Sequence, residues 1–205
     1  MHMLFYNKGS FDEDIGGWVT SKCTSMTNMF RDAAAFDQDI GGWDTSRVTN
    51  MENMFEGATA FDQDISGWDT SKCTTMRMVF YGAAAFDQDI SGWDTSKCTN
   101  MYNMFFNAAV FNQDISGWDT SKCTDMRQMF YNAGAFSQDI SPWCVALISS
   151  EPSNFGNAGT DPIWGTCPPA CTTGADGTEC QNGGTATGLI PFGTEATDAC
   201  SCTCA

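Results

Sequence analysis

One sequence unit recurs every 25 residues along most of this 205-residue chain. The copy from Thr49 to Trp68 reads TNMENMFEGATAFDQDISGW, and it matches again when it is moved by 25 residues in either direction. Three columns hold one large apolar residue type without insertion or deletion: Met1, Met26, Met51, Met76, Met101 and Met126; Phe5, Phe30, Phe55, Phe80, Phe105 and Phe130; Trp18, Trp43, Trp68, Trp93, Trp118 and Trp143. A strict period of this length over six copies predicts a solenoid of stacked rungs.

Each copy is expected to hold one short helix and one short strand. Apolar or small residues lie at Met51, Met54, Phe55 and Ala58, which is the i, i+3, i+4, i+7 spacing of one helical face. The preceding threonine is in the place of an N-cap, and Glu52 three residues later completes a capping box. The segment 68–74 is expected to be extended.

A single copy is too small to bury its own apolar side chains. Neighbouring copies must therefore cover them, with equivalent residues stacked at the parallel-strand spacing of roughly 4.8 Å. This predicts a continuous core in which every rung contributes the same set of side chains. In the third copy these core-ladder residues are Met51, Met54, Phe55, Phe61, Ile65 and Trp68.

The repeat also resembles a known family. The run M-x-x-M-F-x-x-A-x-x-F-[DN]-Q-D-I-[SG]-x-W-D-T-S-[KR]-[CV]-T, over residues 1 to about 143, is similar to the BspA-like surface-protein repeat, a divergent relative of leucine-rich repeats. The resemblance implies an α/β solenoid, a leucine-rich-repeat-like right-handed superhelix of about six rungs. It also implies a location outside the cell and a structural or interaction role in place of catalysis.

Three segments are predicted from the sequence. Residues 1–143 form the repeat solenoid, and residues 144–166, which are rich in proline and glycine but keep several large apolar side chains, form a cap over the last rung. Residues 167–205 hold six cysteines, which predicts a disulfide-rich module in an oxidising compartment. This segment resembles an EGF-like module of the protist type that lacks the usual closing turn.

Eleven cysteines fall into two groups. The expected disulfide cysteines are Cys144, Cys167, Cys171, Cys180, Cys200, Cys202 and Cys204. Inside the repeat, Cys73, Cys98 and Cys123 occupy a site that usually holds valine in the family, so two interpretations stay open: buried thiols that act as small apolar groups, or one cross-rung disulfide. Cys23 faces Val48 and has no such neighbour.

Composition excludes several function classes. Nine Lys and Arg against 25 Asp and Glu give a net charge of −16, which repels nucleic acid and anionic membranes. No run of about 18 apolar residues is present, so membrane insertion is not expected. His2 is the only histidine, so a Ser-His or Cys-His catalytic pair and a multi-histidine zinc site lack material. We therefore expect no enzyme activity.

The columns of aspartate suggest calcium binding as one interpretation. The run D-x-D-x-S-G at 62–67 copies the first half of an EF-hand loop, but the twelfth position is Cys73, where a bidentate glutamate is needed. The preferred interpretation is that each aspartate accepts backbone N–H groups in a turn. No cofactor is therefore expected, with calcium as the alternative.

Two functions are carried forward. The first is a structural subunit of an extracellular filament or cell-surface fibre that self-associates head to tail through the ends of the solenoid, with an assembly surface at Met1, Met3, Leu4, Phe5 and Phe11. The alternative is a cell-surface adhesin or recognition module that binds a glycan or protein through one face. This alternative predicts an exposed patch that breaks the repeat, for which Tyr81, Tyr102, Phe106 and Tyr131 are the candidates. The same aromatics fit lateral contacts in a fibre equally well. No N-x-S/T sequon occurs, which leaves O-glycosylation as the type of glycan attachment that the sequence allows.

Overall fold

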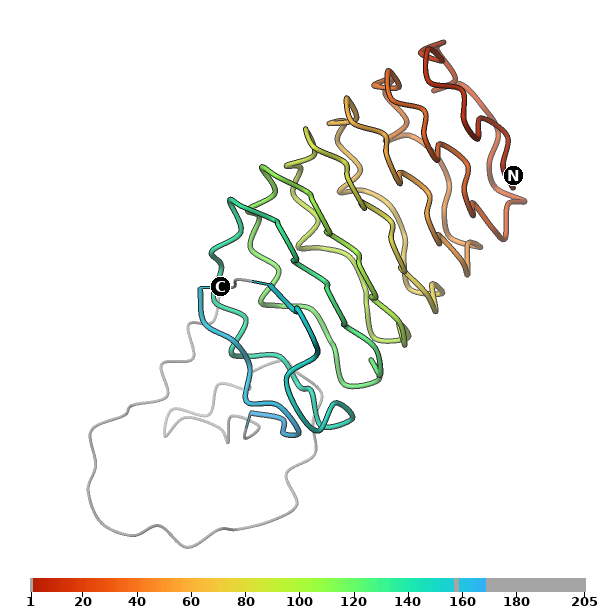
Figure 1. The fold of residues 1–205 in the computed structure, drawn as a ribbon. Helices are drawn as coiled ribbons and strands as arrows, with labels where there is room; N and C mark the ends of the chain where they lie inside the picture. Colours follow the sequence, from red (N-terminus) through yellow and green to blue (C-terminus); the bar gives the residue numbers. More distant parts are fainter. Residues whose placement is uncertain (1, 157–158, 169–205) are drawn as a thin grey trace, which may run out of the picture. The chain divides into compact units, whose positions relative to one another are not determined.

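Successive 25-residue copies stack as the rungs of a coil in the computed structural model, which describes residues 2–156 and 159–168. Figure 1 shows the rungs following one another in chain order. We count positions within a rung from the methionine column, so that position 1 is Met26 in rung two and Met51 in rung three, and rung six is 126–150. Equivalent positions of neighbouring rungs lie above one another and form columns.

The rungs contain neither helices nor extended strands over the described ranges 2–156 and 159–168. The β pairing found there consists of isolated parallel bridges: Ser25 to Asn50, Asn50 to Thr75, Thr75 to Asn100, Asn100 to Asp125, Phe130 to Gly156, and Asp139 to Thr160. The prediction of an α/β solenoid with one helix and one strand per rung is therefore wrong. Turns occupy the segment for which a helix was expected.

Left-handed backbone explains the missing helix. Positions 3 and 7 of the rungs have positive φ, at Met3, Asn28, Asn53, Met78, Asn103 and Gln128, and at Asn7, Asp32, Gly57, Gly82, Asn107 and Asn132, with φ between 54° and 69°. An α-helix requires negative φ at every residue, so two such residues four apart interrupt it twice. Asparagine and glycine, which tolerate this region best, hold most of these sites.

The left-handed residues redirect the backbone hydrogen bonds. In rung three the N–H groups of positions 3, 5 and 7 donate to carbonyl groups of rung four at 2.8–2.9 Å, whereas those of positions 4 and 8 donate to the carbonyl three residues earlier at 3.0 Å. Alternate donors thus serve the neighbouring rung and the local turn. Every second residue ties one rung to the next, although no continuous strand is present.

The core consists of stacked columns of identical side chains. The six core-ladder residues of rung three are all buried, with Trp68 the most exposed at 3%. Phe55 and Phe80 stack with ring centroids 5.8 Å apart, and Phe55 and Phe61 of one rung stack at 4.0 Å. The indole N–H of Trp68 donates to the Ile40 carbonyl at 3.2 Å, so the one polar group of this buried side chain is paired.

Rung six runs on through the segment 144–150, and a shortened seventh rung covers it. The Phe130 N–H donates to the carbonyl of Phe155, 25 residues later, whereas Ile140 N–H donates to Thr160, only 20 residues later. The seventh rung has therefore lost several residues between these two contacts. Phe155 also turns edge-on to Phe130, at 87°, which ends the parallel ring stack.

The chain divides into two units, Met1–Cys167 and Pro168–Ala205. Only Pro168 of the second unit belongs to the described residues, so the expected EGF-like module lies outside them. A search of the described residues for a helix long and apolar enough to cross a membrane finds none.

Candidate functional site

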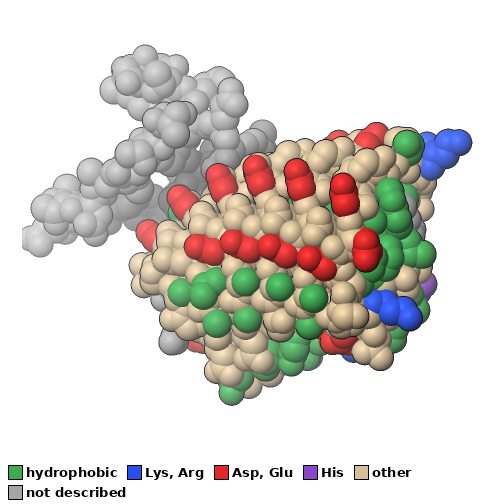
Figure 2. Space-filling view, turned by 90° about the horizontal axis from the view of Figure 1, so that it is seen from above, with side chains coloured by type: hydrophobic (Ala, Val, Ile, Leu, Met, Phe, Trp, Pro, Cys, Tyr) green, Lys and Arg blue, Asp and Glu red, His purple; other side chains and the backbone are tan. Residues whose placement is uncertain are grey.

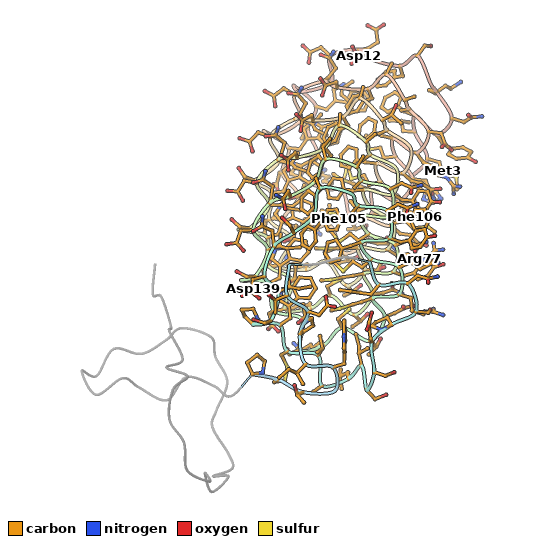
Figure 3. All side chains as sticks on the ribbon, turned by 60° about the vertical axis from the view of Figure 1, so that its left-hand side comes forward. Met3, Asp12, Arg77, Phe105, Phe106 and Asp139 are labelled. Carbon is orange, nitrogen blue, oxygen red and sulfur yellow. A yellow bond between two sulfur atoms is a disulfide. The ribbon has the colours of Figure 1, made fainter. Side chains whose placement is uncertain are left out.

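Two outward columns differ from rung to rung, while most other columns repeat. Position 2 holds Thr27, Glu52, Arg77, Tyr102 and Arg127 in rungs two to six, and position 6 holds Arg31, Glu56, Tyr81, Phe106 and Tyr131. We call these ten residues the variable face. They alternate with inward positions 1, 4, 5 and 8, and Figure 3 shows Arg77 and Phe106 on the opposite side of the stack from Asp139.

Position 6 forms an aromatic stack at the surface of rungs four to six. The Tyr81 and Phe106 rings lie 4.6 Å apart and nearly parallel, and Phe106 and Tyr131 lie 5.0 Å apart. Tyr131 is 37% exposed, and Tyr81 and Phe106 are half-buried. Because the rings cover one another's faces, their edges point to the solvent.

Position 2 places one tyrosine between two arginines. The guanidinium groups of Arg77 and Arg127 lie over the Tyr102 ring, 5.3 and 5.2 Å from its centroid. The Tyr102 hydroxyl donates to the Gln128 side-chain oxygen at 3.3 Å. Cation–π contacts of this kind hold the long arginine side chains in one orientation.

Ion pairs extend this pattern to the earlier rungs and to the edge of the face. Arg77 Nη1 contacts Glu52 Oε1 at 2.6 Å, and the Arg127 guanidinium donates twice to the Asp125 carboxylate, at 2.9 and 2.8 Å. The hydrogen bond from Arg127 lowers the pKa of Asp125. Both arginines are therefore oriented by a carboxylate on one side and by the tyrosine ring on the other.

The Arg31–Glu56 pair is less complete. One contact of 3.1 Å joins Arg31 Nη2 to Glu56 Oε1, while Arg31 Nε and Glu56 Oε2 are buried without a hydrogen-bond partner. Burial raises the pKa of Glu56 and outweighs the opposite effect of Arg31. This part of the variable face thus holds polar atoms whose hydrogen-bonding capacity is unused.

The aspartate columns are occupied by structural hydrogen bonds. Asp62 Oδ1 accepts the Asp87 N–H and the Gln88 side-chain amide from the next rung, at 3.0 and 2.9 Å. Asp64 Oδ1 accepts Ser66 N–H in its own turn, at 2.9 Å, and Asp69 does the same for Ser71. Figure 2 shows acidic side chains in rows along the stack. Among the residues that the structure describes, no group of three or more His, Cys, Asp or Glu is placed to hold a metal ion.

The cysteines of the repeat are free thiols. Cys73, Cys98 and Cys123 are buried, and Cys23 is half-buried. Desolvation raises the pKa of Cys73 to about 12, that of Cys98 to about 11 and that of Cys123 to about 12. These three side chains therefore pack as neutral small apolar groups.

The remaining predicted disulfide cysteines divide between described and undescribed parts of the chain. Cys144 and Cys167 form a disulfide, which joins rung six to the end of rung seven. The other five lie outside the described residues: Cys171, Cys180, Cys200, Cys202 and Cys204.

The predicted assembly surface lies on the first rung. Met3 and Leu4 are each 48% exposed, whereas Phe5 and Phe11 stack at 3.7 Å and are partly buried against the core. Met1 lies outside the described residues. The corresponding end at rung six is covered by rung seven.

Sequence reasoning found the aromatic members of the variable face but not their partners. Arg31, Arg77 and Arg127 were not singled out, and Glu52 was assigned to a capping box, although it pairs with Arg77. A comparison of the copies position by position contains the missing signal, because positions 2 and 6 range over charged and aromatic residues while positions 1 and 5 beside them stay Met and Phe.

Comparison with known families agrees with this repeat pattern. The family model described as "Mycoplasma protein of unknown function, DUF285" matches residues 1–76 and 62–161, which is most of the chain. The chain belongs to this family. The match is consistent with the resemblance to BspA-like repeats, and the DUF285 region includes the whole variable face. No curated protein and no solved structure gives a significant match.

Proposed function

We propose that this chain is a non-catalytic recognition module that works outside the cell and binds a glycan or a protein through its variable face. The observation that carries the proposal is the concentration of rung-to-rung variation in positions 2 and 6. Repeat proteins place their binding residues on one surface of an otherwise regular scaffold. Tyrosine and arginine, which dominate rungs four to six of this face, are the residue types most enriched at binding hot spots.

An extracellular location is supported by the Cys144–Cys167 disulfide, because disulfides persist in oxidising compartments. The net charge of −16 supports a partner other than nucleic acid or an anionic membrane. The lack of an asymmetric cluster of catalytic groups on the near-identical rungs supports a role in binding.

Substitutions on matched faces test the proposal. The full chain is screened against glycan and extracellular-protein arrays, and each ligand found is titrated against Tyr102→Ala and Phe106→Ala. Each variant lacks one hot-spot side chain, so each should bind the ligand at least about tenfold more weakly than the unaltered chain. The control is Lys72→Ala, which removes an exposed charge from another column. Ligands that bind all three variants equally would overturn the assignment of this face.

Filament formation is the second candidate. It is favoured by the exposed apolar side chains of rung one, among which Val19 is 86% and Trp18 is 37% exposed. Rung seven weakens it, because head-to-tail stacking through both ends needs an uncovered rung at each end. Electron microscopy of concentrated protein distinguishes the two: filaments without array binding favour assembly, and dispersed particles with array binding favour recognition.

A further inference from the structure

The junction between rungs six and seven contains a cleft. It has a volume of about 610 Å³ and is bounded on one side by Asn100 and residues 124–127 and on the other by residues 147–153. Binding sites for small ligands and peptide segments commonly have volumes of about 300–1,000 Å³. This cleft is distinct from the aromatic stack at position 6, although Arg127 at position 2 of the variable face also lines the cleft.

Backbone groups in and beside the cleft lack the hydrogen bonds that their equivalents make in the earlier rungs. The Met101 N–H donates to the Asp125 carbonyl at 2.8 Å, and the Asn103 N–H donates to the Arg127 carbonyl at 3.1 Å. One rung later, the equivalent N–H groups of Met126 and Gln128 have no such partner among residues 2–156 and 159–168, even though Met126 is fully buried.

The Thr124 carbonyl is the third backbone group to be compared with its equivalent in the preceding rung. The Thr99 carbonyl accepts the N–H and the hydroxyl of Thr124, at 2.9 and 3.1 Å. The Thr124 carbonyl, one rung on, accepts neither kind of bond from the described part of the chain. Three consecutive ladder bonds are therefore missing, over the residues that border the cleft. Buried backbone groups are almost always paired in folded proteins, so the N–H of Met126, the buried residue of this set, points to a missing partner.

In rung seven, proline holds the position whose carbonyl accepts the position-3 N–H in earlier rungs. Pro152 stands one rung after Arg127, and its carbonyl accepts the Phe155 N–H at 3.2 Å in a local turn. The carbonyl equivalent to the usual acceptor of the Gln128 N–H thus makes a local bond within rung seven. The chain leaves the ladder after Ile148 and returns to it only at Phe155.

We propose that this cleft binds an extended, net basic polypeptide segment, which adds as a short parallel strand beside residues 124–128. Main-chain hydrogen bonds would supply the contacts, as in other cases of strand addition to an open edge. One residue of the bound segment would donate its N–H to the Thr124 carbonyl. The carbonyl of the next residue in the segment would accept the Met126 N–H, and the carbonyl two residues after that would accept the Gln128 N–H. This repeats the pattern between Thr99 and Thr124 and between Met101 and Asp125.

Charge favours a basic segment. Asp125 and Arg127 neutralise each other through two hydrogen bonds, which leaves the exposed Glu151 as the unpaired charge on the cleft wall. Burial raises the pKa of Asp161, and repulsion from Glu151 adds to the rise, so these two acidic groups lie near each other on rung seven. The net charge of −16 attracts cationic segments over a longer range.

Hydrogen exchange on the full 205-residue chain tests the first half of the proposal. The amides of Met126 and Gln128 should exchange faster than those of Met101 and Asn103, which occupy the same positions with their bonds made. The probe is the peptide acetyl-Thr-Asn-Ala-Lys-Asn-amide, which follows the rung sequence with a small inward and a basic outward residue. Its addition should slow exchange at Met126 and Gln128 and leave Met101 and Asn103 unchanged.

Modified peptides and one protein variant test the geometry and the charge. N-methylation of the peptide threonine removes the donor to Thr124 and should weaken binding about tenfold, the effect of one hydrogen bond. N-methylation of the following asparagine, whose N–H points away, should change binding less than about threefold. The unaltered chain should bind this peptide more tightly than an analogue in which the peptide lysine is replaced by glutamate. Glu151→Lys should reverse that preference.

The proposal is overturned if Met126 and Gln128 are as protected as Met101 and Asn103 in the free chain, because residues 149–153 would then fill the ladder themselves. It is also overturned if the peptide shifts no amide signals at about millimolar concentration. Either result leaves the variable face untouched, because Tyr102→Ala and Phe106→Ala report on that surface separately.

Discussion

The buried columns and the variable face obey opposite sequence rules in the same rungs. At positions 1, 5, 11, 15 and 18 almost every copy keeps one residue type, whereas positions 2 and 6 change from charged to aromatic between neighbours. Inside, each ring is stacked between two others, so a change in one rung alters the fit in three. Outside, a residue needs only a compatible neighbour in its column, and Arg77 beside Glu52 or Tyr102 satisfies that need.

The comparison teaches that repetition in this protein serves stacking, and that variation is permitted where stacking does not depend on it. It also explains why the aspartate columns vary little from rung to rung. They face outward, as the variable face does, but they change little, because each Asp62-type carboxylate holds a backbone N–H of the next rung. Outward position alone is therefore no measure of tolerance to substitution.

Removal of one core ring should show the largest effect. Phe80→Ala is expected to lower the free energy of unfolding by about 3–5 kcal/mol, because a fully buried ring stacked on Phe55, Phe86 and Phe105 leaves a cavity. Phe106→Ala on the variable face should cost about 1 kcal/mol or less. Urea unfolding of the two variants compares them, and equal losses would contradict the distinction between the two regions.

Loss of one carboxylate that joins two rungs should have the second largest effect on stability. Asp62→Ala is expected to cost about 1–3 kcal/mol, because the Asp87 N–H and the Gln88 amide lose their acceptor. Asp62→Asn keeps an acceptor oxygen and should cost much less, since Asn112 already holds Ser137 N–H at 2.9 Å in the same column. If the alanine and asparagine variants unfold at the same urea concentration, the hydrogen bonds that Asp62 accepts do not stabilise the stack.

A side chain at a left-handed position tests the turn geometry beside the variable face. Gly82 has φ of 66°, and a Cβ added there makes only ordinary van der Waals contact, with its nearest atom, the Gly57 nitrogen, 3.9 Å away. Gly82→Asn should be nearly neutral, because asparagine holds the same position in the next two rungs with φ of 57°. Gly82→Val should cost about 1–2 kcal/mol from backbone strain alone. Thermal unfolding that ranks valine above asparagine would contradict the assignment.

The smallest effect concerns the buried thiols at alkaline pH. The folded state raises the pKa of Cys98 to about 11, whereas an unfolded thiol titrates near 8.5. The folded form therefore keeps its proton while the unfolded form loses it, so stability falls as pH rises from about 8.5 to about 11. At pH 9.5 the loss from this group is about 1 kcal/mol.

Cys98→Val removes this dependence and keeps the packing, since Val48 fills the same column two rungs earlier. Urea unfolding at pH 7.5 and 9.5 should show a smaller decrease for the variant than for the unaltered chain. In parallel, a thiol reagent should modify Cys23 in the folded chain and leave Cys73, Cys98 and Cys123 unmodified until unfolding. Rapid native modification of the latter three would contradict their burial.

Part of the candidate binding surface was accessible from sequence. Tyr81, Tyr102, Phe106 and Tyr131 interrupt the repeat and were expected at an exposed patch. Their arrangement was not accessible, because the contact of Tyr102 with Arg77 and Arg127 joins residues 25 positions apart. The cleft beside residues 124–127 was even less accessible from the sequence. The backbone groups beside it that lack ladder bonds are recognised only when the backbone bonds of neighbouring rungs are compared.

The sequence by itself determined the 25-residue period and the side chains that form the core, because a column must hold compatible residues in every rung if the rungs are to stack. The tertiary structure decided the conformation of the rung. Apolar residues at i, i+3, i+4 and i+7 face one side in a helix, but they also do so in consecutive turns with left-handed residues at positions 3 and 7. The turns release every second N–H group to the next rung, and a helix would keep those groups for itself, so stacking selects the turns.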